Sequence, residues 1–149
     1  MTDVKMKSYR PFITENFFWD FPTRFNLKEV SEFLNEDIDP TTEYISDTAK
    51  TIMRNDGIYW CIQKKHSDQI VALISLSDLD LEKHQAALMI TFKNLSDTEK
   101  QEISRRLLTF VKDQINLETI EINQLDHTVQ ENFTNNGYNV SNNNILKRS

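Results

Sequence analysis

The fold of this chain is decided by the stretch IYWCIQK at residues 58–64 together with QIVALISLS at residues 69–77. Both runs are rich in β-branched and aromatic residues, which favour β-strands. Only the four residues KHSD, 65–68, separate them, and so short a loop predicts an antiparallel hairpin. A third strand is expected at residues 85–92, so this part of the chain forms three consecutive antiparallel strands.

A long helix is predicted directly after the third strand. Ser96 and Glu99 have the spacing of a capping box, and the helix is expected to run to about Asn116. Apolar residues recur at helical spacing and predict one buried face, made of Ile103, Leu107, Val111 and Ile115.

The segment after this helix favours a further strand at residues 119–123, where apolar and polar residues alternate. A strand that follows a long helix is expected to lie parallel to the strand before it. A second capping box, Thr128 with Glu131, predicts a short helix closed by Gly137. Residues 138–141 and 145–148 are then expected to pair with each other.

The N-terminal third predicts a short strand at residues 9–14 and two helices. The first helix is expected to begin after Asn26, and the second after Asp39, with Pro40 in its first turn and its end near Asn55. Between them and the first strand lies an aromatic cluster, for which core packing and the lining of a ligand cleft are both open: Phe17, Phe18, Trp19, Phe21 and Phe25.

This element order predicts one domain, residues 1–149, of the mixed α/β (α+β) class. The central sheet is expected to be mostly antiparallel, with about six to seven strands and about four flanking helices.

The composition of the chain limits the cellular compartment and the classes of partner that are expected. The chain has 38% hydrophobic residues, no long apolar run and no signal-peptide pattern at its N-terminus, so a cytoplasmic protein without membrane association is expected. The net charge is −6 and the basic residues are scattered, which argues against nucleic acid and favours a small-molecule amine or a protein N-terminus as partner. Cys61, the single cysteine, lies in an apolar run and is expected to be a buried structural thiol.

The element order resembles that of the GNAT acyltransferases. The stretch Tyr9-Arg-Pro-Phe12 looks like the opening of the ribosomal-protein-type N-acetyltransferases, and Tyr59-Trp-Cys-Ile62 resembles their second strand. Asn136-Gly-Tyr138 is similar to the Gly-Phe that follows the last helix of the family. The resemblance implies the GNAT fold, acetyl-CoA as co-substrate, and transfer of an acetyl group to a primary amine.

The family's motif for the CoA diphosphate, Gln/Arg-x-x-Gly-x-Gly/Ala at the start of the long helix, is replaced in this chain. Glu99 stands at the Arg position, Glu102 at the first Gly and Ser104 at the second. A carboxylate near a helix N-terminus repels a diphosphate, and losing glycine blocks close approach of the backbone. The resemblance then leaves these residues as candidate cofactor-binding groups: Lys93, Ser96, Lys100, Ser104 and Arg105.

The catalytic residues implied by the resemblance are also altered. Phe133 occupies the position of the tyrosine that protonates the departing thiolate, and phenylalanine has no proton to give. Asp126 falls where many members carry Asn. Glu82 and His84, at the start of the third antiparallel strand, are the candidate general bases.

No metal site is predicted, because the three histidines are too scattered for zinc and residues 78–82 lack the pattern of a calcium loop. Two functions therefore remain open: an acetyl-CoA-dependent N-acetyltransferase, or a catalytically degenerate GNAT-like domain that binds a small molecule or a protein. A monomer and a homodimer both remain open.

Overall fold

The strands form one eight-stranded sheet within residues 4–142 and 144–148, which the computed structural model describes. The spatial order is β1-β2-β3-β4-β5-β6-β8-β7. The strands are β1 (Phe12–Ile13), β2 (Phe17–Asp20), β3 (Ile58–Lys64), β4 (Ile70–Asp80), β5 (Gln85–Phe92), β6 (Thr119–Ile122), β7 (Tyr138–Ser141) and β8 (Ile145–Arg148).

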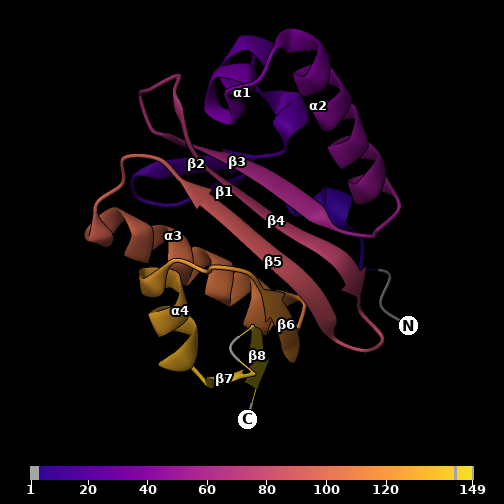
Figure 1. The fold of residues 1–149 in the computed structure, drawn as a ribbon, viewed down its shortest axis with the longest axis vertical. Helices are drawn as coiled ribbons and strands as arrows, with labels where there is room; N and C mark the ends of the chain where they lie inside the picture. The colour runs from indigo at the N-terminus through magenta and orange to yellow at the C-terminus, as the bar shows by residue number, and fades with distance from the viewer. Residues whose placement is uncertain (1–3, 143, 149) are drawn as a thin grey trace.

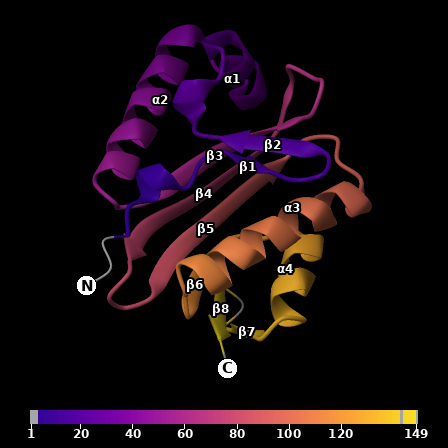
Figure 2. The same cartoon turned by 180° about the vertical axis from the view of Figure 1, so that it is seen from behind.

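Helices cover both faces of this sheet (Figures 1 and 2). One pair packs over β3 and β4 on one face, and the other pair, with the turn that extends it, lies on the opposite face. The helices are α1 (Leu27–Leu34), α2 (Ile38–Met53), α3 (Asp97–Thr109) and α4 (His127–Thr134), with the short turns η1 (Met6–Ser8), η2 (Pro22–Arg24) and the π-helical η3 (Phe110–Gln114).

Strand β4 lies at the centre of the core. Its residues from Ile70 to Leu76 are buried, so both faces of the strand are covered. Ile74 and its neighbours on one face pack with α3, whereas Leu73 on the other face packs with Val30 and Phe33 of α1. The predicted hairpin of β3 with β4 and the antiparallel pairing of β4 with β5 are confirmed.

Strand β6 pairs parallel to β5, as the crossover through the long helix predicts. The pairing joins Gln85–Leu88 to Thr119–Ile122. Strand β5 continues to Phe92, whereas β6 ends at Ile122, so the two segments separate beyond Leu88.

The sheet has one strand more than the upper end of the prediction. Residues 17–20, which the sequence indicated only as an aromatic cluster, form β2, and the expected strand at residues 9–14 is reduced to β1. Three aromatic residues in a row, followed by Asp20, show no alternation, so periodicity could not reveal the strand. Phe17 and Trp19 are fully buried in the core, which decides for packing for these two rings.

Helix α3 begins as predicted, with both hydrogen bonds of the capping box from Ser96 and Glu99. Its predicted inner face is buried. The α-helix ends at Thr109, however, and the expected remainder continues as the π-helical turn η3, in which the amide of Ile115 bonds to the carbonyl of Phe110.

Two helix starts differ from the prediction. Helix α2 begins at Ile38 after Asp37, because Pro40 is tolerated within the first turn as well as at the first position. Helix α4 is capped by Asp126, whose carboxylate accepts from the amide of Thr128 at 2.9 Å, so the expected box of Thr128 with Glu131 does not form. In the expected box the Glu131 side chain would accept from the amide of Thr128, but this amide already donates to Asp126.

No helix within the part of the chain that the structure describes is long and apolar enough to span a membrane.

Tyr138 ties β7 to the segment before β6. Its ring is buried, and its hydroxyl donates to the carbonyl of Leu117 at 2.6 Å. Burial raises the pKa of Tyr138 to about 12 from an ordinary 10.0. Because the folded protein then holds this proton more tightly than the unfolded chain, the stabilisation is complete below pH 10.0 and is lost as the pH rises toward about 12.

We expect Tyr138→Phe to lower the free energy of unfolding near neutral pH by about 1–2 kcal/mol, because the carbonyl of Leu117 loses its buried partner. The variant should also lose less stability at alkaline pH than the parent. Urea unfolding followed across this pH range measures both effects. Tyr9→Phe is the matched control, since the Tyr9 hydroxyl makes no hydrogen bond within the described residues; equal losses in both variants would contradict the prediction.

Candidate functional site

The candidate site is built around the place where β5 and β6 separate. We call this opening, between residues 89–92 of β5 and residues 123–126 that follow β6, the strand gap. On the edge of β5 that faces β6, the ladder stops at Leu88 within the described residues. Only four residues separate the end of β5 from the start of α3, so the N-terminus of the helix lies beside the gap.

The N-terminus of α3 is occupied by its own capping residues. The Ser96 hydroxyl accepts from the amide of Glu99 at 3.2 Å, and the Glu99 carboxylate accepts from the amide of Ser96 at 3.0 Å. Glu99 also pairs with the ammonium of Lys64 at 2.8 Å. The contact with Lys64 is the main reason why the pKa of Glu99 lies below its usual value, so a negative charge stands at this helix start.

Lys100 spans the strand gap. Its ammonium lies 2.9 Å from the carboxylate of Asp126, which caps α4, and 5.7 Å from the ring centroid of Phe92 at the end of β5. The side chain therefore contacts both sides of the gap at once. The sequence named Asp126 and Lys100 for separate reasons, and only the tertiary structure brings them together.

The other predicted cofactor-binding residues divide between two regions. Arg105, on the face of α3 that carries Gln101, lines a polar cavity of about 300 Å³ with His127 and other residues of α4. Ser104 is fully buried, and its hydroxyl donates to the carbonyl of Lys100 at 2.6 Å. Lys93 turns to the opposite face of the sheet, where its ammonium donates to the carbonyl of Phe33 and lies 4.5 Å from the ring centroid.

Glu102 points away from the gap and holds the β1–β2 turn. Its carboxylate accepts from the Thr14 hydroxyl and, at 2.8 Å, from both the backbone and the side-chain amide of Asn16. Partial burial acts to raise the pKa of Glu102, but these hydrogen bonds outweigh it and the net pKa lies below its usual value. Glu102, at the position of the family's first glycine, therefore has a structural role as the anchor of the β1–β2 turn.

Phe133 is fully buried and its ring packs edge-on to Tyr138, with 5.3 Å between the centroids. Cys61 is also buried, as predicted, and burial raises the pKa of its thiol to about 12. Neither side chain offers a proton donor to the gap.

Glu82 and His84 lie in the turn between β4 and β5, at the end of β5 remote from α3. The His84 ring nitrogen Nδ1 is 3.1 Å from the carbonyl of Asn116. His84 lies four positions before Leu88, which is roughly 13 Å at the usual rise per residue of a strand. The structure therefore does not bring these two candidates to the strand gap.

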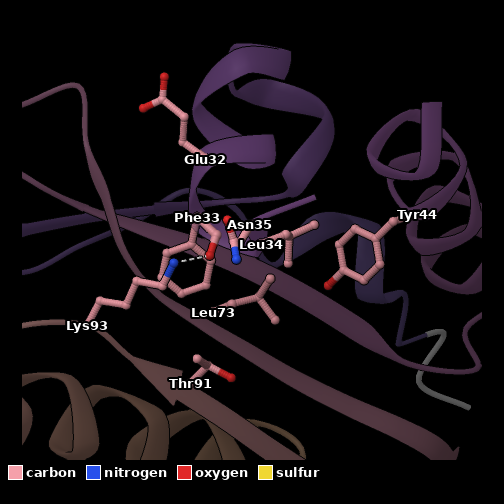
Figure 3. A pocket seen from close by; sticks show the side chains of 8 residues that line it. All are labelled: Glu32, Phe33, Leu34, Asn35, Tyr44, Leu73, Thr91 and Lys93. Atoms are coloured by element: carbon pink, nitrogen blue, oxygen red, sulfur yellow. Dashed lines mark hydrogen bonds between the residues drawn. The ribbon is translucent and has the colours of Figure 1, made fainter. Parts of the chain in front are cut away.

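A cavity of about 570 Å³ opens on the α1–α2 face of the sheet (Figure 3). Its floor is Leu73 and Thr91, and its walls include Phe33 at the end of α1 and Tyr44 of α2, whose hydroxyl points inward. Burial is the main cause that raises the pKa of Tyr44 above its ordinary value, with nearby Cys61 and Tyr59 adding to it. We call this space the α1–α2 cavity.

A second opening of about 240 Å³ lies beside the paired part of β5 and β6 and is lined by Ala87 and Glu121. Ala87 and Thr91 point to the same face of β5, with Met89 between them, 58% exposed. The uncovered face of β5 thus runs from the α1–α2 cavity to Glu121. Sequence reasoning missed Glu121; its place opposite Ala87, one pair before the gap, depends on the register of β6.

Within the described residues, no three His, Cys, Asp or Glu side chains are grouped so that they could hold a metal ion.

The same arrangement of sheet and helices is found in solved acetyltransferases. The chain has the GNAT fold. A putative ribosomal-protein-serine acetyltransferase from Vibrio cholerae is 11% identical over 94% of each chain, with a TM-score of 0.67. The ribosomal-protein-S5-alanine acetyltransferase from Vibrio fischeri is 11% identical over 94% of this chain and 96% of its own, with a TM-score of 0.69.

The microcin C7 self-immunity acetyltransferase, solved in complex with acetyl-CoA and AMP, is 13% identical over 91% of this chain and 93% of its own, with a TM-score of 0.63. No family model matches this sequence, and no curated protein matches it. The similarity is therefore one of fold and confirms the architecture expected from the resemblance.

The hydrogen bonds between the Glu102 carboxylate and the β1–β2 turn can be tested directly. We expect Glu102→Gln to lower the free energy of unfolding by about 1 kcal/mol, since charge-assisted hydrogen bonds to the β1–β2 turn are lost. Because the pKa of Glu102 is lowered by folding, this contribution is present near neutral pH and is lost as the pH falls through the lowered pKa.

Urea unfolding at neutral and at acidic pH measures this effect. Glu118→Gln removes the same charge from an exposed side chain and serves as the control. If Glu102→Gln lowers the free energy of unfolding no more than the control does, the hydrogen bonds of Glu102 contribute nothing to stability.

Proposed function

We propose that this protein is an acetyl-CoA-dependent N-acetyltransferase that transfers an acetyl group to a primary amine. The observation that carries the proposal is the strand gap beside the N-terminus of α3, with an uncovered face of β5 next to it. Solved proteins of the same fold supply support, since two of them were determined with CoA or with acetyl-CoA.

Acetyl-CoA fits the gap through the edge of β5 and two side-chain cations. Beyond Leu88 the backbone of β5 has no strand partner on the β6 side within the described residues, so it is available to an amide-bearing chain. Lys100 in the first turn of α3 and Arg105 in its third turn are the cations that would hold the diphosphate in place of a glycine loop. When bound, acetyl-CoA supplies an activated acetyl group as a thioester.

The diphosphate has to compete with Asp126 for Lys100. The ion pair is partly exposed, with 23% and 25% of the two side chains accessible, and such pairs contribute little to stability. A doubly charged diphosphate is therefore able to exchange with the carboxylate. Glu99 opposes binding, because it adds negative charge at the same helix start.

The acceptor amine approaches along the uncovered face of β5. The α1–α2 cavity has room for its body, and Glu121 lies one strand pair before the gap, where it is placed to take the proton of the attacking amine. The net charge of −6 favours a cationic acceptor, either a small amine or a protein N-terminus.

The reaction needs no protein nucleophile. The amine nitrogen attacks the acetyl carbonyl carbon, the new C–N bond forms as the C–S bond breaks, and the amine proton passes to a base. Phe133 cannot protonate the departing sulfur, so CoA leaves as the thiolate and takes its proton from solvent.

A second function is favoured by the same side chains. The capping box fills the start of α3, Lys100 with Asp126 bridges the gap, and Phe133 lacks a hydroxyl group. These features suit a domain that has lost catalysis and binds a small molecule or a protein in the acceptor cavity. This second function predicts that the protein does not turn over acetyl-CoA.

Two measurements separate these functions. Isothermal titration with acetyl-CoA tests co-substrate binding, and release of free CoA thiol in the presence of a panel of primary amines tests transfer. Binding together with amine-dependent release supports the acetyltransferase. Absence of binding at millimolar acetyl-CoA refutes it and leaves the binding domain.

The ion pair across the gap predicts a specific response. We expect Asp126→Asn to strengthen acetyl-CoA binding about tenfold, because it frees Lys100 and removes a repelling carboxylate, whereas Lys100→Gln should weaken it. Asparagine still caps α4, so the fold is kept. Titration of both variants against Asp113→Asn, an exposed carboxylate elsewhere on the chain, is the measurement; no difference between Asp126→Asn and this control would contradict the proposed diphosphate site.

The proton acceptor can be identified by a comparison of variants. We expect Glu121→Gln to lower kcat by about a hundredfold with little change in the KM for acetyl-CoA, because a general base acts on the amine alone. Loss of rate in Glu82→Gln or His84→Gln instead would assign the role to the residues predicted from the sequence.

Three further expectations belong to the same proposal. We expect the protein in the cytoplasm, which cell fractionation tests. We expect residues 1–149 to fold as one domain, which limited proteolysis tests. We expect the active species to be a monomer or a homodimer, which sedimentation tests.

A further inference from the structure

A groove distinct from the strand gap carries a separate inference. It is lined by residues of η1, η2 and the second half of α2. Its volume is about 320 Å³.

The charge of this groove is unusual for the chain. Three of its lining side chains, Lys7, Arg10 and Arg24, are cationic and none is a carboxylate, although the whole chain carries a net charge of −6. Arg10 is held by Asp20, which accepts from Nε at 2.6 Å and from Nη2 at 3.0 Å. The side chains of Lys7 and Arg24 have no ion-pair or hydrogen-bond partner among the described residues.

The floor of the groove is apolar. Phe21 and Ile52 are 7% and 3% exposed and form its base, with Ala49 beside them. Met53 stands at the rim and is 66% exposed, an unusually large accessible surface for a methionine. A ligand that covered Met53 would therefore bury apolar area at one end while it met the cations at the other.

The size of the groove points to a small molecule. Sites for small ligands run from about 300 to 1,000 Å³, and this groove lies at the lower end of that range. Guanidinium groups bind carboxylates with a matched, two-bonded geometry, and the bond of Arg10 to Asp20 is an example within the same groove wall.

We propose that this groove binds a small organic carboxylate with a medium-length apolar body. The carboxylate meets Arg24 and Lys7, and the hydrocarbon lies on Phe21 and Ile52. The groove contacts the second half of α2, whereas the α1–α2 cavity meets that helix at Tyr44, so the two spaces are distinct. The inference does not depend on acetyl transfer.

Octanoate is the probe that tests the groove, by isothermal titration of the full chain. We expect Lys7→Gln with Arg24→Gln to weaken octanoate binding by roughly tenfold or more, because the two unpaired cations are removed. Both side chains are exposed and without partners, so the fold is kept. Lys50→Gln, an exposed cation on α2 outside the groove, is the matched control and should leave the affinity unchanged.

Two further comparisons test the apolar half. Butanoate, four CH₂ groups shorter, should bind at least about tenfold more weakly than octanoate. Ala49→Leu, which fills the groove and keeps every charge, should abolish binding.

The proposal is overturned if octanoate fails to bind at millimolar concentration. It is also overturned if Lys50→Gln weakens binding as much as the double variant, or if butanoate and octanoate bind equally, since either result would mean attraction to charge alone.

Discussion

Strand β4 is buried on both faces, and the rest of the structure follows from that constraint. A strand with Ile70 to Leu76 buried needs a layer of side chains above and below it, so one pair of helices cannot suffice. Helices α1 and α2 cover one face and α3 with α4 covers the other (Figures 1 and 2). The apolar β4 thereby sets the three-layer architecture on which the candidate site is built.

The two layers do not cover the sheet equally, and the candidate site lies where cover is missing. Helices α1 and α2 pack over β3 and β4, so the same face of β5 stays open at Met89. The parallel pairing of β5 with β6 stops after four residue pairs, which leaves the strand gap beside the start of α3. An uncovered face and an unpaired edge on one strand give a ligand both an entry and backbone partners.

The start of α3 shows how one segment can serve the fold at the expense of ligand binding. Glu99 completes the capping box, and Glu102 anchors the β1–β2 turn from 88 residues away in sequence. Both carboxylates stabilise the folded chain, and Glu99 also adds negative charge where a diphosphate would bind. Lys100 offsets that charge, but its own charge is paired with Asp126. The balance among Glu99, Lys100 and Asp126 decides whether the fold binds an anion here.

The sequence by itself determined the elements whose signals are local. Alternating and apolar runs predicted β3, β4 and β5, and the capping box of Ser96 with Glu99 located α3, because those patterns act over a few residues. The tertiary structure decided what depends on distant partners. Lys100 with Asp126 and Glu102 with Thr14 join residues 26 and 88 positions apart. The place of Glu121 beside the gap follows from strand register, which no local pattern encodes, since register is set by the packing of the whole sheet.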